Sequence, residues 1–360
     1  MSFPRRLARA AALISALLAT QAFAEGKKVT LSQAFQSMLY LPLYVAIDEG
    51  FFTRQGLDLT KETAGAPTVA LSAVISGSAQ FSIHGPEWTA IAASKGAPVD
   101  IIANVVNGAA VWIATTPDFK FDSIKDVKGQ KVVTGLMPTT STSLFIKLLK
   151  ENSMDAKTDV EMIQVAIGSE PGPFIGKQAD VAVMYEPGLD QAVAKGMKVV
   201  FGFPKTYGAY AFSAVTARND VDPDTAQRVV NGMEMAMRFM VSNEAKTVEI
   251  VKKEFPNLDP AVVEAAVKRM LADGVYPRSV DITADALKVS MDTQIALGNL
   301  ASQPDYKSFV VKKFIEPALA MKISADPGHA IVMPAPVARI HVLDILMDRR
   351  DMDGSGQARP

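Results

Sequence analysis

The sequence contains no cysteine among its 360 residues, and this absence excludes several kinds of chemistry. Disulfides, thiol nucleophiles, iron–sulfur clusters and cysteine-based zinc sites are all ruled out. A lipid-modified N-terminal cysteine is ruled out as well. Only three histidines are present, so a histidine-rich metal site is not expected. The sequence therefore predicts neither a metal nor another cofactor.

The chain also lacks an excess of charge of either sign. It has 37 Lys and Arg residues against 38 Asp and Glu, which gives a formal net charge of -1. Nucleic-acid-binding proteins usually carry a strong basic excess, so no nucleic-acid partner is expected. After residue 24 no apolar run approaches the roughly 20 residues that a membrane-spanning helix needs. We therefore expect no stable membrane insertion of the mature chain.

The N-terminal segment has the three-part layout of a secretory signal peptide. Three arginines within residues 1–9 precede an apolar run over residues 10–19, and Ala22-Phe23-Ala24 follows as a small-x-small site. A membrane anchor is the alternative, but the apolar run is too short to span a bilayer. We predict cleavage after Ala24 and a periplasmic mature protein, with the general secretory and twin-arginine routes both open.

The length and composition are sufficient for two domains with their own cores. The chain is 49% hydrophobic and 21% charged, which excludes a disordered protein. A core of this size can be stable without disulfides.

Strand-like and helix-like segments alternate through the first half of the chain, as in parallel βαβ units. Strands are expected at residues 29–34, 57–60, 79–83 and 99–106, and helices at 43–49, 67–76 and 87–94. The alternation restarts at residue 111. Residues 211–217 form a β-rich run that could return to the first lobe, and helical spacing dominates after residue 224.

These patterns predict an α/β fold with two lobes. We expect the first lobe over residues 25–107 plus 209–322 and the second over 108–208. The tail, residues 323–360, has no assigned role, although 337–347 could form a short amphipathic helix.

Several motifs in this order resemble a known family. They are Tyr40-Leu41-Pro42-Leu43-Tyr44-Val45-Ala46, Glu49-Gly50-Phe51-Phe52, Gly56-Leu57-Asp58-Leu59, Gly65-Ala66-Pro67, Lys95-Gly96-Ala97-Pro98 and Tyr185-Glu186-Pro187. Together they resemble bacterial ABC-transporter substrate-binding proteins of the sulfonate, nitrate, taurine and thiamine-pyrimidine branch. The resemblance runs from about residue 29 to residue 321.

This resemblance implies a bilobal periplasmic-binding-protein fold of a type II-like kind. Two chain crossings, near Gly108–Val111 and Gly208–Ala211, would join the lobes as a hinge. A small organic ligand would bind in the interlobe cleft, and hinge closure would trap it. The partners would be an ABC permease and its ATPase, and the protein would be a monomer. We expect a binding protein rather than an enzyme.

Four loops are expected to border the cleft, because ligands of open α/β sheets lie outside the carboxyl ends of the strands. These loops are residues 36–40, 65–68, 84–88 and 138–143. With the crossings and the Tyr185-Glu186-Pro187 turn, they predict the following ligand-binding residues: Gln36, Ser37, Tyr40, Gly65, Thr68, His84, Glu87, Trp88, Asn107, Trp112, Thr139, Thr140, Ser141, Thr142 and Glu186.

The residues in these loops allow more than one ligand chemistry. The hydroxyl-rich run 139–143 enters a helix and suits a sulfonate, carboxylate or phosphate-like group, although plain N-capping is the alternative. Trp88 could stack on a flat ligand and Glu87 could accept hydrogen bonds from an amine. The alternatives are core packing for Trp88 and a first-turn acid for Glu87. A flat nitrogenous ligand such as a pyrimidine is therefore also possible, and the four loops contain no arginine clamp.

Two other functions share this fold by resemblance. One is a pyrimidine-synthesising enzyme, a class associated with a cysteine-rich motif that this chain lacks. The other is a sensor subunit that binds ligand and reports to a membrane receptor.

Overall fold

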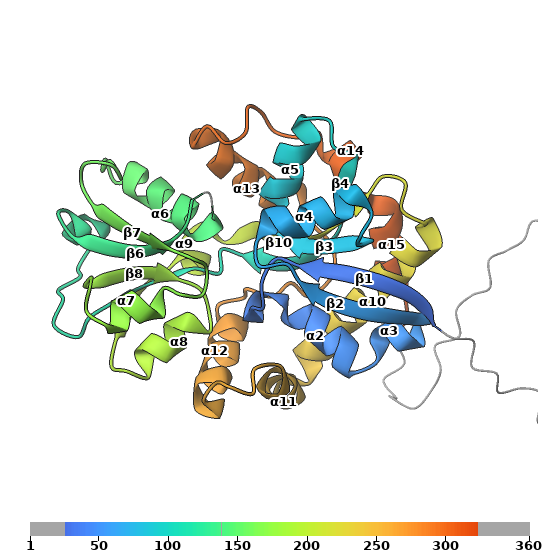
Figure 1. The fold of residues 1–360 in the computed structure, drawn as a ribbon, viewed down its shortest axis with the longest axis horizontal. Helices are drawn as coiled ribbons and strands as arrows, with labels where there is room; N and C mark the ends of the chain where they lie inside the picture. Colours follow the sequence, from blue (N-terminus) through green and yellow to red (C-terminus); the bar gives the residue numbers. More distant parts are fainter. Residues whose placement is uncertain (1–25, 138, 323–360) are drawn as a thin grey trace, which may run out of the picture. The chain divides into compact units, whose positions relative to one another are not determined.

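The computed structural model describes residues 26–137 and 139–322 (Figure 1). These residues form two five-stranded sheets with helices around each. The first sheet has the strand order β2-β1-β3-β10-β4, and the second has the order β7-β6-β8-β5-β9. The predicted signal peptide and the predicted helix at 337–347 lie outside the described residues.

The first sheet combines the predicted parallel strands with one returning strand. Its strands are β1 (Lys27–Gln33), β2 (Leu57–Thr63), β3 (Phe81–His84), β4 (Val99–Gly108) and β10 (Ala209–Arg218). β1 is parallel to β2 and β3, whereas β10 is antiparallel to both β3 and β4. The β-rich run near residue 211 therefore returns to the first sheet, as the sequence predicted.

The helices between these strands follow the proline and glycine positions of the sequence. They are α2 (Leu41–Asp48), α3 (Phe51–Arg54), α4 (Pro67–Ser76) and α5 (Pro86–Ser94), with a 3-10 turn η1 (Met38–Tyr40) before α2. α4 starts at a proline and ends at Gly77, whose φ of 81° is left-handed. The one-turn helix α3 was not predicted, because four residues carry no helical periodicity.

The second sheet is also mixed. Its strands are β5 (Trp112–Thr115), β6 (Lys131–Gly135), β7 (Glu161–Val165), β8 (Val181–Met184) and β9 (Lys198–Gly202). β6 is parallel to β7 and β8, and β5 is antiparallel to β8 and β9. The helices of this lobe are η2 (Ile124–Val127), α6 (Thr140–Glu151), α7 (Pro171–Ile175), α8 (Gly188–Val193) and α9 (Phe203–Tyr207).

Two neighbouring chain segments connect the sheets. The chain leaves the first sheet between β4 and β5 and returns between α9 and β10. Gly108 and Ala209 are paired in the β4–β10 ladder, so the two crossings lie side by side. Gly208 has φ 62° and ψ -135°, a conformation that a residue with a Cβ rarely adopts.

The C-terminal helices complete the first lobe and also reach the second. They are α10 (Pro223–Ser242), α11 (Glu244–Glu254), α12 (Pro260–Ala272), α13 (Ala284–Ala296), α14 (Tyr306–Phe309) and α15 (Lys312–Ala320). α10 packs against α2, α3 and α15, and its methionines are buried as core residues. α12 contacts α8, and α13 contacts α6. Within the described residues, no helix combines the length and apolar character that spanning a membrane requires.

Candidate functional site: a cleft between the two sheets

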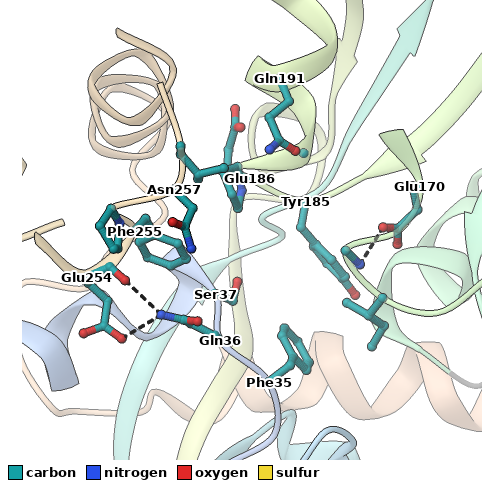
Figure 2. Close-up of a pocket in the computed structure, with 16 residues that line it drawn as sticks. Phe35, Gln36, Ser37, Glu170, Tyr185, Glu186, Gln191, Glu254, Phe255 and Asn257 are labelled. Carbon is teal, nitrogen blue, oxygen red and sulfur yellow. Dashed lines mark hydrogen bonds between the residues drawn. The ribbon is translucent and has the colours of Figure 1, made fainter. Parts of the chain in front are cut away.

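A cavity of about 470 Å³ lies where loops of both lobes meet. Figure 2 shows its labelled side chains, which come from four segments of the chain. The walls are the loop after β1, the loop after β7, the turn from β8 into α8, and the connection from α11 to α12. We call this space the outer cavity.

A second, much smaller space lies beside the outer cavity. It has a volume of about 20 Å³, which is room for about one water molecule. Tyr40, Glu87 and Trp88 from the first lobe line it together with Thr139 and Thr140 from the second. We call it the inner cavity.

An aromatic pair forms part of the wall of both cavities. The rings of Phe35 and Tyr185 are stacked, with centroids 6.5 Å apart and planes at 23°, and Ile167 lies in both walls as well. Phe35 belongs to the first lobe and Tyr185 to the second, so this ring contact crosses the cleft. Phe212 holds the Tyr185 ring from another side in an edge-on contact at 5.9 Å.

Most of the side chains that line the cavities lie on loops at the carboxyl ends of the strands. The loops that line the cavities follow the carboxyl ends of β1, β3, β6, β7 and β8. Carboxyl ends of strands in an α/β lobe open toward the ligand-binding crevice. The two lobes therefore present their crevices to each other.

Glu87 joins the two lobes. Its residue is 1% exposed, and its Oε1 accepts a hydrogen bond of 2.7 Å from the Thr140 hydroxyl at the start of α6. Its Oε2 is buried with no hydrogen-bond partner among the described residues. Burial raises the pKa of Glu87 to about 7, against the lowering effect of the Thr140 hydrogen bond.

Glu170 occupies a comparable position in the second lobe. Its residue is 1% exposed, and its Oε2 accepts a 2.6 Å hydrogen bond from the Gly168 N–H. Within the described part of the chain its Oε1 has no partner. Burial raises the pKa of Glu170 to about 7. A Cβ at Gly135 would lie 3.4 Å from Oε1 and 3.0 Å from the Thr139 hydroxyl, so the carboxyl group sits beside the hydroxyl-rich run.

Tyr185 is a neutral phenol whose ionisation is disfavoured by both of these acids. Its oxygen accepts a 2.8 Å hydrogen bond from the Ser141 N–H. Burial raises the pKa of Tyr185 well above its usual value, and the charges of Glu170 and Glu87 add to that rise. Its ring can therefore serve as an uncharged wall at neutral pH.

Glu186 lines the outer cavity but is already engaged by α12. Its Oε1 accepts a 2.9 Å hydrogen bond from Arg269, whose guanidinium also donates to Asp190 at 2.6 Å. Its Oε2 accepts from the Asp190 N–H at 3.0 Å. Burial and the neighbouring Asp190 raise the pKa of Glu186, and Arg269 opposes that rise. Both oxygens of Glu186 are thus committed within the protein.

The hydroxyl-rich run at the start of α6 is also internally bonded. Thr140 donates to Glu87, the Ser141 N–H donates to Tyr185, and the Thr142 hydroxyl donates to the Gly135 carbonyl at 2.6 Å. Thr139, the N-cap residue, makes no side-chain capping hydrogen bond. The run therefore connects the lobes and stabilises the Tyr185 wall, while the buried Ser143 hydroxyl has no hydrogen-bond partner among the described residues.

The structure brings some predicted residues to the cavities and leaves others apart. Those that line a cavity are Gln36, Ser37, Tyr40, Glu87, Trp88, Thr139, Thr140 and Glu186. Gln36 donates to Glu254 across the rim (Figure 2). Gly65 and Thr68 are exposed, and only their neighbour Pro67 reaches the inner cavity wall.

His84 lies in the core. It is fully buried and is hydrogen-bonded to Ser82 at 3.0 Å and to the Gly85 carbonyl at 2.9 Å. Burial lowers the pKa of His84 to about 4, so the ring is neutral at physiological pH.

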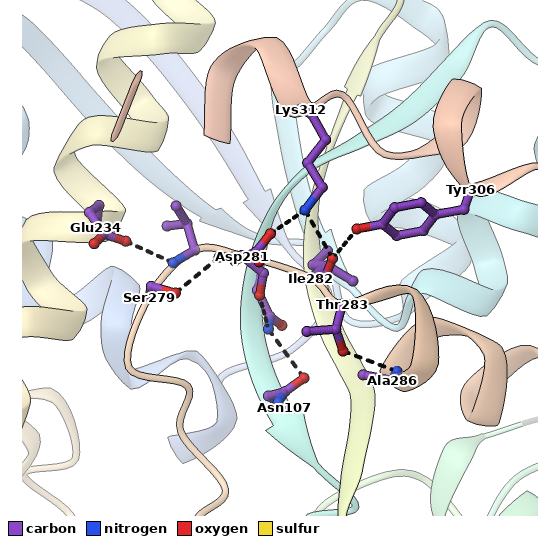
Figure 3. A network of polar contacts seen from close by, with 11 residues as sticks. Asn107, Glu234, Ser279, Asp281, Ile282, Thr283, Ala286, Tyr306 and Lys312 are labelled. Carbon is purple, nitrogen blue, oxygen red and sulfur yellow. Dashed lines mark hydrogen bonds and ion pairs between the residues drawn. The ribbon is translucent and has the colours of Figure 1, made fainter. Parts of the chain in front are cut away.

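Asn107 and Trp112 lie at the crossings. Figure 3 shows Asn107 in a polar network, where its side-chain oxygen accepts from Asn104 at 3.4 Å. Trp112 is 1% exposed, and its ring N–H donates a hydrogen bond of 2.9 Å to Asp273. It also lines a separate cavity of about 610 Å³ beside α12.

Sequence reasoning missed several residues that line the outer cavity. They are Phe35, Ile167, Gly168, Glu170, Tyr185, Pro187, Gly188, Gln191 and residues 254–258. The Glu170 loop follows the strand β7, so the rule that located the other loops could have included it. The 254–258 connection joins two helices and carried no such signal. Among the described residues, no group of three or more His, Asp or Glu is placed to hold a metal ion.

The fold and the cleft define a two-lobed protein of the periplasmic-binding-protein fold. A sequence profile described as "NMT1/THI5 like" matches residues 38–266, and the chain belongs to that family. The family resemblance identified in the sequence is confirmed. The chain is 23% identical over 309 residues to "Putative binding protein YtlA" of Bacillus subtilis (strain 168), covering 82% of this chain and 91% of that protein.

Solved structures with this fold include binding proteins and an enzyme. The alkanesulfonate-binding protein SsuA from Xanthomonas axonopodis pv. citri, bound to MOPS, is 15% identical with a TM-score of 0.63, covering 82% of this chain and 98% of its own. The nitrate-binding protein NrtA from Synechocystis PCC 6803 is 15% identical with a TM-score of 0.66, covering 84% and 91%. The desulfurization enzyme DSZB is 13% identical with a TM-score of 0.62, covering 81% and 99%.

Proposed function

We propose that this protein is the solute-binding component of an ABC import system and captures a small organic molecule in the outer cavity. The observation that carries the proposal is a cavity of about 470 Å³ whose walls come from both lobes. Ligand sites of drug-sized molecules have volumes of roughly 300–1,000 Å³. YtlA, SsuA and NrtA, which share this fold or family, are each named as binding proteins.

We also propose the boundaries of the two lobes and the cellular location of the protein. The first lobe comprises residues 25–107 plus 209–322, and the second comprises residues 108–208. The mature chain starts at residue 25, acts in the periplasm as a monomer, and delivers its ligand to a permease with a separate ATPase.

Binding works by a shift between open and closed lobes. The adjacent crossings at Gly108 and Gly208 supply the hinge. The Thr140–Glu87 hydrogen bond and the Phe35–Tyr185 contact join the lobes and must break on opening. A ligand that touches both walls favours the closed form by its difference in affinity for the two forms.

The candidate ligands are a sulfonate, a carboxylate or a pyrimidine-like molecule. The aromatic walls of the outer cavity suit a flat body in each case. The ligand must also fit between hydrogen-bonding side chains such as Gln36, Gln191 and Asn257.

An enzyme is the second candidate, favoured by one observation. Burial raises the pKa values of Glu87 and Glu170 to about 7, which suits general acid–base work. DSZB shows that the fold also supports an enzyme. Product analysis of the bound ligand after hours with the protein separates the two candidates, because a binding protein returns its ligand unchanged.

The test is a thermal-shift screen of residues 25–360 against sulfonates, carboxylates, nitrate, pyrimidines and amines. A ligand at about 100 times its dissociation constant adds roughly 2.7 kcal/mol of stability. We expect one class to raise the melting temperature, and the variant Tyr185→Leu to lose that rise. The exposed-site variant Lys120→Ala should retain it. A screen in which no class raises the melting temperature would contradict the proposal.

A further inference from the structure

The charged residues that line the two cavities are all acidic. The lining residues include four acids, Glu87, Glu170, Glu186 and Glu254, and no lysine or arginine. Two of the acids have cationic partners elsewhere in the protein. Glu186 is paired with Arg269, and Glu254 is paired with Lys61.

Glu87 and Glu170 differ from the other two acids. Within the described residues neither has a salt-bridge partner, and each has one buried oxygen without a hydrogen bond. A buried acceptor without a hydrogen bond is destabilising, so each oxygen is a position where a donor from a ligand would be stabilising. Glu87 lies in the first lobe and lines the inner cavity, Glu170 lies in the second and lines the outer cavity, and Tyr185 lines both cavities.

We infer that the cleft takes a cationic ligand, a protonated amine or amidine on a small flat body, and that Glu87 and Glu170 recognise its charge. This inference rests on the proposed function and narrows its ligand class. Charge-assisted hydrogen bonds between N–H donors and carboxylates are roughly twice as strong as neutral ones. A sulfonate, carboxylate or nitrate would instead face two carboxyl groups with no positive charge in the lining.

The aromatic walls agree with this ligand class. Phe35, Tyr185 and Phe255 line the outer cavity, so its wall includes aromatic surface that a flat body can contact. Cations are attracted to the faces of aromatic rings when they lie within about 6 Å of a ring centroid. The inner cavity, with about 20 Å³, has room for an ammonium-sized group next to Glu87.

The number of protons released or taken up on binding distinguishes a cationic ligand from an anionic one. The pKa values of both are near 7 because of burial. The titratable groups facing Glu87 are Tyr40, Tyr185 and Tyr210, and Tyr185 also faces Glu170; the pKa of each tyrosine is raised, so all three are neutral. A cationic ligand stabilises the carboxylates and releases protons as it binds. An anionic ligand favours the protonated acids and takes up protons.

The experiment compares three ligands that share one ring and differ in charge. Benzamidine is a cation, benzamide is neutral and benzenesulfonate is an anion. Titration calorimetry at pH 6 and pH 8, in two buffers of different ionisation enthalpy, gives both affinity and proton release. We expect benzamidine to bind at least tenfold more tightly than benzamide. Its affinity should rise from pH 6 to pH 8 by about tenfold for each acid that must be ionised, hence by about tenfold to a hundredfold.

Two variants locate the effect. Glu170→Gln and Glu87→Gln keep the side-chain size, and each should weaken benzamidine at least tenfold while leaving benzamide within twofold. The matched control Glu62→Gln, at an exposed position on β2, should leave all three affinities unchanged. Unfolding midpoints without ligand confirm that each variant folds.

The outcomes separate this inference from the proposed function. Tighter binding of benzenesulfonate than of benzamidine, or proton uptake on binding, overturns the cationic ligand class and leaves capture of a small molecule intact. Binding of none of the three also overturns the inference as stated, and the wider thermal-shift screen then decides whether the cleft captures ligands at all.

Discussion

At the scale of single residues, the cleft contains two buried acids, Glu87 and Glu170, that have no cationic partner among the described residues. Glu87 is 1% exposed, and within residues 26–137 and 139–322 its one side-chain donor is the Thr140 hydroxyl. A buried carboxyl group with little hydrogen bonding is stable mainly when it is protonated. Glu87 therefore couples the protonation of the cleft to the contact between the lobes.

The first prediction concerns Glu87→Gln. The pKa of Glu87 in the folded protein is raised by burial from 4.5 to about 7. The protonated acid is thus favoured by folding, and its contribution to stability is fully present below pH 4.5 and lost as the pH rises through about 7. Each unit of such a shift corresponds to about 1.4 kcal/mol. We expect Glu87→Gln to be more stable than wild type at pH 8, by about 1–3 kcal/mol.

Urea unfolding at pH 4.5 and at pH 8 measures this difference. At pH 4.5 the two proteins should have nearly the same free energy of unfolding. Glu62→Gln, at an exposed position, serves as the control and should behave like wild type at both pH values. An equal difference between Glu87→Gln and wild type at both pH values would contradict the raised pKa of Glu87.

The contacts of individual side chains were the part of the structure that the sequence predicted least completely. The sequence placed Glu87, Trp88 and the 139–142 run near a ligand because they follow strands. It could not show that the hydroxyl groups of this run would be satisfied within the protein, since Glu87 and Tyr185 lie 53 and 44 residues away from their partners. His84 follows a strand as well, but its ring turns into the core, which depends on packing rather than on local pattern.

At the scale of elements, α12 is tied to α8 of the second lobe. Arg269 bonds Glu186 and Asp190, which are 0% and 2% exposed at their side chains. Trp112 at the first crossing donates to Asp273 at the end of α12. These polar contacts join α12, which comes from the C-terminal part of the chain, to the second lobe.

The second prediction tests this connection with Arg269→Met. Removing the guanidinium leaves two buried carboxyl groups without their cation, and breaking a buried pair in this way costs about 3–5 kcal/mol. We expect a loss of stability of that order in urea unfolding. Arg269→Lys should recover only part of it, because a lysine cannot bond both acids with a planar fork.

The neighbouring residue provides a matched control. Lys268 is exposed and pairs with Glu264 on the surface at 2.8 Å. Exposed pairs contribute about 0–1 kcal/mol, so Lys268→Met should have little effect. Equal losses for Arg269→Met and Lys268→Met would mean that α12 is not held by its buried acids.

Most helices and strands could be predicted from the sequence, but the shortest helices could not. The prolines and glycines around α4 gave its bounds, residues 67–76, correctly. α7 and α9 have five residues each, too few for an apolar periodicity to be read. The contacts of α12 and α13 with the second lobe had no local signal, because they depend on side chains that are far apart in the sequence.

At the scale of the whole molecule, the proposed capture of a ligand requires two lobes that move about the adjacent crossings. The alternation of strands and helices predicted both lobes, and the β-rich run near residue 211 predicted the return strand β10. The sequence could not give the volume of the cleft. That volume depends on the distance between the two lobes, which is set by side chains from loops and helices far apart in the sequence.

The absence of cysteine makes the lobe motion directly measurable. The variants Thr60→Cys on β2 and Glu161→Cys on β7 place one spin label on an exposed edge strand of each sheet, and no native thiol competes for the label. Pulsed dipolar spectroscopy then gives the distribution of distances between the lobes. The measurement is made without ligand and with a saturating ligand found in the thermal-shift screen. We predict that the ligand changes the distribution to a single narrower population at a different mean distance, because it selects the closed form. A ligand that binds and leaves the distribution unchanged would contradict capture by closure of the cleft.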